Sequence, residues 1–86
     1  METRVAVMSI IVEYGEMVEL LNSILHEYGE YIIGRMGIPY RKRNVSVIAI
    51  AQDAPQNTIA ALSGKVGSLK GISVKTAYSG VISAGE

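Results

Sequence analysis

The 86-residue chain contains no cysteine, and its eight basic and eight acidic residues balance at neutral pH. The lack of cysteine excludes disulfides, thiolate metal sites and thiol nucleophiles. A neutral domain has no global field that attracts nucleic acid. No apolar run approaches the roughly 18–20 residues of a membrane span, and no small-residue cleavage site follows the first apolar stretch. These absences predict a cytoplasmic protein that does not bind membranes.

Apolar residues are plentiful for so short a chain. Hydrophobic residues make up 49% of the sequence, and the mean hydropathy is +0.28. The length fits one domain, and a domain of this size buries only about 60–65% of the surface that its unfolded chain exposes. The apolar content therefore exceeds what one small core needs. We expect the surplus to be buried in a homo-oligomer, either a dimer or a higher even-numbered assembly.

The order of predicted elements is strand, helix, strand, strand, helix, strand. The four apolar runs that resemble strands are residues 5–12, 31–38, 45–51 and 72–78, and the two helical patterns are residues 16–28 and 55–69. This order predicts an α+β, ferredoxin-like two-layer sandwich in which two helices cover one face of an antiparallel four-stranded sheet. We expect one domain over residues 1–79 and a flexible C-terminal tail over residues 80–86.

Charge distinguishes central strands from edge strands. The runs 5–12 and 45–51 carry no charge, which is typical of central strands that are covered on both faces. The other two runs contain Arg35 and Lys75, and such charges discourage stray pairing at sheet edges. The ferredoxin-like topology also places the first and third strands in the middle, so the two lines of reasoning agree.

Small residues lie beside the apolar stripe of the second predicted helix. They are Ala60, Gly64 and Gly67. Each glycine in a helix costs roughly 1 kcal/mol relative to alanine. The pattern predicts close approach of another backbone, from the first helix or from a partner subunit.

The segment Ser63-Gly64-Lys65 resembles part of a phosphate-binding loop. The upstream glycine of that motif is absent, however, and Val66 replaces the hydroxyl that binds magnesium. Nucleotide hydrolysis is therefore not expected. A weaker role, in which the glycine-rich helix end and Lys65 hold an anion, stays open beside a purely structural role.

His26 is the only histidine, and it follows Asn22 by four residues on the same helical face. Without cysteine, a transition metal would need carboxylates or several subunits to complete its ligand shell. The pair is either a solvated polar pair or part of a ligand pocket at a subunit boundary. No metal site is predicted.

Gly15 joins the first strand to the first helix. The helix N-terminus exposes unpaired N–H groups, and a glycine lets a ligand approach the backbone. An ordinary strand-to-helix turn explains the same residues. The hairpin turn is predicted over residues 38–44, and its basic residues Arg41, Lys42 and Arg43 are interpreted as solvated. No nucleophile–base pair or carboxylate dyad is visible, so we expect no enzyme.

Four motifs resemble those of the iron-only hydrogenase system regulators, a family of small proteins associated with iron-only hydrogenases. The motifs are Asn22-x-x-Leu25-His26, Arg35-x-Gly37-x-Pro39, the segment from Asn57 to Gly67, and Gly71-x-x-Val74-Lys75-Thr76. The resemblance covers residues 4–78. It implies a non-enzymatic regulatory module that is related to ACT domains and to the C-terminal domain of nickel-responsive repressors, which assemble into oligomers and bind small effectors at interfaces.

The resemblance also suggests where an effector would bind. Gly15 matches the loop glycine at which ACT domains often hold their effector, although Tyr14 replaces the proline that usually precedes it. The expected ligand-binding residues are Gly15, Asn22, His26, Arg35 and Lys65. No cofactor is implied. The nickel ligands of the repressors have no counterparts, because one histidine and no cysteine are present.

The expected function is regulation of an iron-only hydrogenase system through a small effector or a protein partner. The DNA-binding arm of the repressors is missing, so we expect no direct DNA binding by this chain alone. Two alternatives remain open. One is a purely structural or protein-interaction module without a ligand, and the other is an accessory subunit of a transcription regulator.

Overall fold

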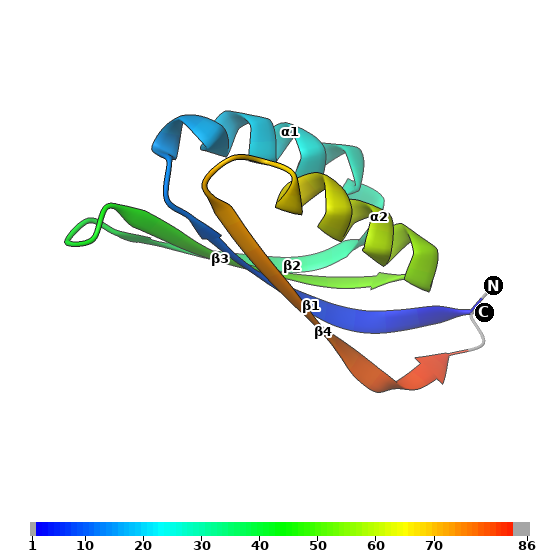
Figure 1. Ribbon diagram of the computed structural model, residues 1–86. Helices are drawn as coiled ribbons and strands as arrows, with labels where there is room; N and C mark the ends of the chain where they lie inside the picture. Colours follow the sequence, from blue (N-terminus) through cyan, green and yellow to red (C-terminus); the bar gives the residue numbers. More distant parts are fainter. Residues whose placement is uncertain (1, 84–86) are drawn as a thin grey trace.

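The computed structural model describes residues 2–83 and contains the predicted elements in the predicted order. They are strand β1 (Thr3–Val12), helix α1 (Val18–Glu27), strands β2 (Ile32–Tyr40) and β3 (Val45–Ala54), helix α2 (Gln56–Gly67) and strand β4 (Ile72–Ser83). Short 3-10 turns precede and follow α1 at Gly15–Met17 and Gly29–Tyr31. Both helices lie on one face of the sheet (Figure 1). The ferredoxin-like α+β class is confirmed.

All strand pairs are antiparallel, and the sheet order is β2-β3-β1-β4. The two runs without charge are therefore the central strands, as predicted. Arg35 and Lys75 lie on the edge strands. Between residues 2 and 83, no helix is long and apolar enough to cross a bilayer.

The last strand continues past its predicted end at Tyr78. Strand β1 begins at Thr3, and its first residues supply partners for this extension: Thr3 pairs with Ser83, and Arg4 pairs with Ile82. Residues 80–83, expected in a C-terminal tail, thus belong to the sheet. Residues 84–86 of that tail lie outside the described residues.

Helix-facing residues of the central strands form the core. The register pairs Met8 with Ile50 and Ile10 with Ile48, and all four are 5% exposed or less. Leucines and a valine from the two helices cover them; they are Leu21, Leu25, Leu62 and Val66. This burial follows from alternation, because every second residue of a strand faces the same side. Burial of apolar surface stabilises a fold by about 25 cal/mol per Å². These contacts are therefore the main force holding the two layers together.

The opposite side of the sheet remains uncovered in this single chain. It exposes large hydrophobic side chains, each between 42% and 62% exposed: Val5, Val7, Ile11, Met36, Ile38, Tyr40 and Val47. The strand register places all of them on one side. We call the outward-facing residues of the sheet the open face.

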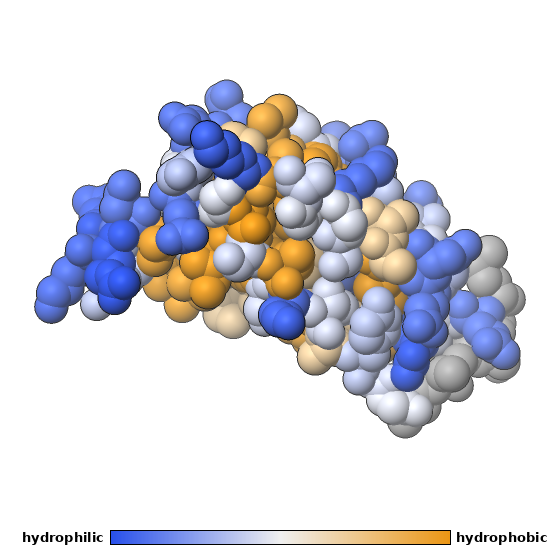
Figure 2. Space-filling view, in the orientation of Figure 1, coloured by the Kyte–Doolittle hydropathy of each residue, from blue (hydrophilic) through white to orange (hydrophobic). Residues whose placement is uncertain are grey.

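The β2–β3 hairpin projects beyond the helices (Figure 1) and contributes to an elongated shape of 43 × 19 × 16 Å. Its turn is shorter than predicted, because β2 continues through Pro39 and Tyr40. Proline is tolerated there because β2 is an edge strand. Figure 2 shows the hydrophilic tip of the hairpin next to a group of hydrophobic residues along its strands.

The two glycines of α2 have different surroundings. A Cβ atom on Gly67 would lie 3.2 Å from Cγ1 of Val74, so this glycine does permit close packing, against a side chain of β4. A Cβ atom on Gly64 would meet no atom within 4 Å. The predicted approach of the first helix to Gly64 is therefore wrong, since the helices pack through other residues. Contact of Gly64 with a partner subunit stays a prediction.

Candidate functional site

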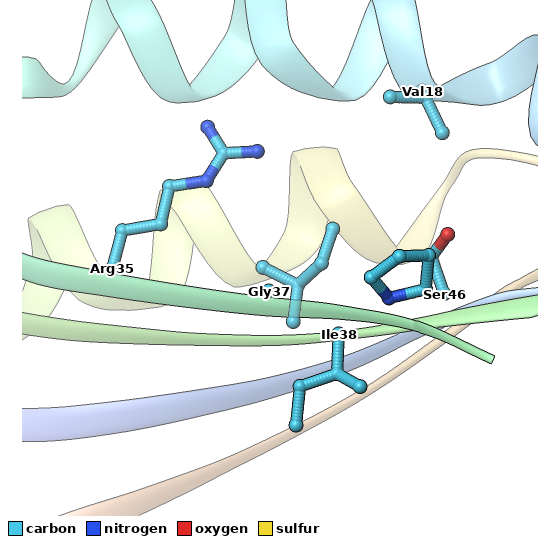
Figure 3. A pocket seen from close by; sticks show the side chains of 7 residues that line it. Val18, Arg35, Gly37, Ile38 and Ser46 are labelled. Atoms are coloured by element: carbon cyan, nitrogen blue, oxygen red, sulfur yellow. The ribbon is translucent and has the colours of Figure 1, made fainter.

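A cleft of about 250 Å³ lies between helix α1 and the edge strand β2. Its lining residues come from α1, β2 and β3: Val18, Arg35, Gly37, Ile38, Pro39, Ser46 and Ile48. Figure 3 shows Val18 facing the sheet from α1 and Arg35 extending from β2 toward the helix. Helix and sheet thus form two walls of one candidate site.

The sequence of β2 explains why this space is not filled. Arg35, Gly37 and Pro39 pair with Ile50, Ile48 and Ser46, so these positions of β2 face the helix side. Glycine at the middle position supplies no side chain. A Cβ atom there would find Cγ1 of Ile48 at 3.9 Å, an ordinary contact. The hollow therefore comes from Gly37 and has room for additional atoms.

Arg35 is held against helix α1 at this cleft. Its Nη2 donates a hydrogen bond of 2.7 Å to Oδ1 of Asn22. No acidic side chain within residues 2–83 forms an ion pair with the guanidinium. Since a guanidinium carries five N–H donors, most of its hydrogen-bonding capacity is available to a ligand. Two of the five predicted ligand-binding residues are thus in direct contact.

The other three predicted residues lie elsewhere. Gly15 begins the 3-10 turn before α1, and a Cβ atom on it would meet nothing within 4 Å. His26 is exposed on α1, one turn beyond Asn22. Lys65 is on α2, where its Nζ lies 5.2 Å from the ring centroid of Tyr28. None of these three lines the cleft.

Lys65 interacts with the C-terminal end of α1. The Tyr28 side chain, as a hydrogen-bonding and electrostatic partner, raises the pKa of the Lys65 ammonium, and the Glu27 carboxylate raises it further. The ammonium is fully exposed. Lys65 therefore stays charged at neutral pH and is a solvated contact between the helices.

The cleft could have been found in part from the sequence. Arg35, Gly37 and Pro39 alternate along a strand, and this spacing places them on one face. Once the register of the hairpin is known, Ser46 and Ile48 can be placed beside Pro39 and Gly37. Val18 could not be found this way, because the angle at which α1 crosses β2 depends on packing of the whole core.

A second hollow, of about 300 Å³, lies on the open face. Apart from Arg35, its lining residues are uncharged: Val7, Gly34, Met36, Ala49 and Ala51. Between residues 2 and 83, no three residues of the types His, Cys, Asp or Glu gather into a group that could hold a metal ion. The two hollows share Arg35, and the lining of the one on the open face is otherwise uncharged.

Two solved structures show how this fold is related to known proteins. Protein TM1266 from Thermotoga maritima has a TM-score of 0.85 and 34% sequence identity, with coverage of 88% of this chain and 96% of that one. A formyltetrahydrofolate deformylase from Pseudomonas putida KT2440 has a TM-score of 0.61 and 13% identity over 85% of this chain, but only 28% of the deformylase is covered. The second similarity shows the fold alone. No match was found among curated proteins.

A family model also matches residues 4–76, which include both walls of the cleft and at least part of every strand. Its description is "TM1266-like: Iron-only hydrogenase system regulator, putative". This match and the similarity to TM1266 cover most of the chain. The chain belongs to the TM1266-like family of iron-only hydrogenase system regulators.

Proposed function

We propose that this chain is a non-enzymatic regulatory module of an iron-only hydrogenase system. It self-associates through the open face of its sheet and binds a small effector or a protein partner. The family description supports the regulatory role. The observation that carries the proposal is the composition of the open face.

The open face is almost free of charge. Among the outward positions that pair across the sheet between Val5 and Ala77, only Asp53 and Lys75 are charged, and their signs are opposite. When one face of an antiparallel sheet stays in water, the residues on that face are normally polar. Soluble monomers rarely expose contiguous apolar patches larger than about 300–600 Å². The seven large side chains of this face therefore favour a covered state.

A second copy of the chain is the simplest cover. One self-complementary patch serves both subunits of a two-fold dimer. Two helices can cover only one side of a four-stranded sheet, so the other side needs a second layer from another chain. Residues of both signs on the face allow like copies to meet without net repulsion.

The test is the mass of the full chain in solution. Light scattering coupled to gel filtration is expected to give twice the chain mass, or a higher even multiple, at micromolar concentration. A mass of one chain that does not change over a hundredfold range of concentration would contradict self-association. In that case the open face would be a surface for a different protein, which is the alternative of an interaction module.

A further inference from the structure

We propose that the cleft between α1 and β2 binds a small organic monocarboxylate, with the carboxylate on Arg35 and a compact apolar group against Val18 and Ile48. This inference deepens the proposed function and rests on it, since it assigns a ligand class to the effector. It depends on three features of the cleft: its cation, its lining and its size.

The cation selects the charge of the ligand. The bond from Nη2 of Arg35 to Asn22 fixes the orientation of the guanidinium and leaves its other N–H groups unused. Within the described residues the guanidinium has no carboxylate partner. Arginine and carboxylate groups match in shape and form paired hydrogen bonds. A carboxylate therefore supplies the partner that the chain itself does not provide.

The lining selects the rest of the ligand. Val18, Pro39 and Ile48 present hydrocarbon, and Ser46 adds a single hydroxyl group. One guanidinium balances one negative charge. A phosphate dianion would bring a second charge and more acceptor oxygens than this lining can satisfy, and its desolvation would be costly. A monocarboxylate with an apolar tail fits both parts of the cleft.

The size of the cleft guides the choice of a probe with a short tail. A water molecule occupies about 30 Å³ in the liquid, so a cleft of about 250 Å³ corresponds to about eight water-sized atoms. Isovalerate has a branched aliphatic tail and a single carboxylate and is within this limit, so it is a suitable probe. Isovaleramide has nearly the same shape but no charge, which makes it the matched control ligand.

The experiment is a titration of the ¹⁵N-labelled full chain with isovalerate, followed by amide chemical shifts. Saturable shifts are expected at Val18, Gly37 and Ser46, whereas isovaleramide is expected to bind at least tenfold more weakly. Arg35→Gln should weaken isovalerate binding roughly tenfold or more, because a charge-assisted hydrogen bond is lost. Arg41→Gln removes the same charge at the hairpin tip and should leave binding unchanged.

A second variant tests the cleft without changing charge. Gly37→Val places a β-branched side chain in the hollow and should abolish the shifts. Gly29→Val is the control, since a Cβ atom there meets nothing within 4 Å and Gly29 lines neither the cleft nor the hollow on the open face. The spectra of both variants show whether the fold is kept. The Arg35→Gln result stands by itself if either valine variant unfolds.

Several results would overturn the proposal. They are the absence of saturable shifts, shifts confined to other regions, equal binding by Arg35→Gln, and inorganic phosphate binding as tightly as isovalerate. The mass of each sample separates this inference from the proposed function. An oligomer that does not bind isovalerate contradicts only the proposed ligand. A monomer that binds isovalerate contradicts only the proposed self-association.

Discussion

The aromatic ring of Tyr14 lies directly against the backbone of Gly71. A Cβ atom on Gly71 would fall 2.7 Å from Cδ2 of Tyr14, and the glycine has a φ of +74°. The N–H group of Glu13 donates a hydrogen bond of 2.8 Å to the carbonyl oxygen of Gly71. Together these contacts join the loop after β1 to the residue before β4.

We expect Gly71→Ala to destabilise the fold by about 2–5 kcal/mol. The left-handed backbone conformation costs about 1–2 kcal/mol for a residue with a side chain, and overpacking against Tyr14 costs about 1–3 kcal/mol more. Urea denaturation monitored by circular dichroism measures the loss. Gly29→Ala is the control, because a Cβ atom there meets nothing within 4 Å. Equal stability of the two variants would contradict the expectation.

The two parts of this cost can be separated. In the double variant Tyr14→Ala with Gly71→Ala, the overpacking is gone but the strained backbone remains. We expect the alanine at position 71 to cost less in this background than with Tyr14 present. A cost that does not change would mean that the ring moves aside freely.

If the chain self-associates as proposed, Val47→Lys is expected to give single chains with little change in secondary structure. Val47 lies near the start of β3, a central strand, and its side chain is on the open face, where a buried unpaired charge would cost several kcal/mol. Light scattering and circular dichroism measure the two effects. Leu20→Lys is the control, since Leu20 is 53% exposed on α1, outside the open face. If Leu20→Lys reduced the mass and Val47→Lys did not, the interface would lie on α1 and not on the open face.

Gly64→Ala is expected to stabilise the chain by about 1 kcal/mol. Gly64 is exposed inside α2 and has free space around it, so the change gains helix propensity without a clash. For a domain of this size, this corresponds to a rise of about 4–8 °C in Tm. Gly67→Ala should gain less, because its Cβ atom would press on Val74. A lower Tm together with a lower mass for Gly64→Ala would instead reveal a partner subunit at this position.

Gln52→Met is expected to stabilise the protein by about 1–2 kcal/mol. Gln52 is 1% exposed, and its buried Nε2 has no hydrogen-bond partner. An unsatisfied buried donor costs about 1–3 kcal/mol, which a thioether of similar shape avoids. Gln56→Met, on the exposed first turn of α2, is the comparison, and it should not gain stability because Oε1 of Gln56 accepts a hydrogen bond of 3.1 Å from Nη1 of Arg4. A lower Tm for Gln52→Met would mean that the amide has a partner in solution, such as an ordered water.

Most of the fold follows from periodicity and charge, because these patterns are local. The uncharged runs around Met8 and Ile48 predicted the two central strands, and Arg35 and Lys75 marked the edges. The extension of β4 to Ser83 was missed since it depends on pairing with Thr3, which no local pattern shows. The contact between Tyr14 and Gly71 was missed for the same reason.

The candidate site was only partly predictable. Asn22 and Arg35 were both selected, and the structure joins them by a hydrogen bond. Their contact requires α1 to cross over β2, which is a result of core packing. Gly37 was noticed as part of a motif, but its role in creating the hollow needs the strand register. Whether Gly15, His26 and Lys65 bind a ligand stays a prediction.

The strand order has a consequence for how the chain is made. The first half of the chain supplies β1 and β2, the second half supplies β3 and β4, and the sheet alternates between halves. Neither half contains a pair of neighbouring strands. During synthesis, β1 and β2 thus have no partner until residues 45–54 leave the ribosome, at about 5–20 residues per second. For that time the apolar strand β1 is exposed, and its protection depends on how soon β3 arrives.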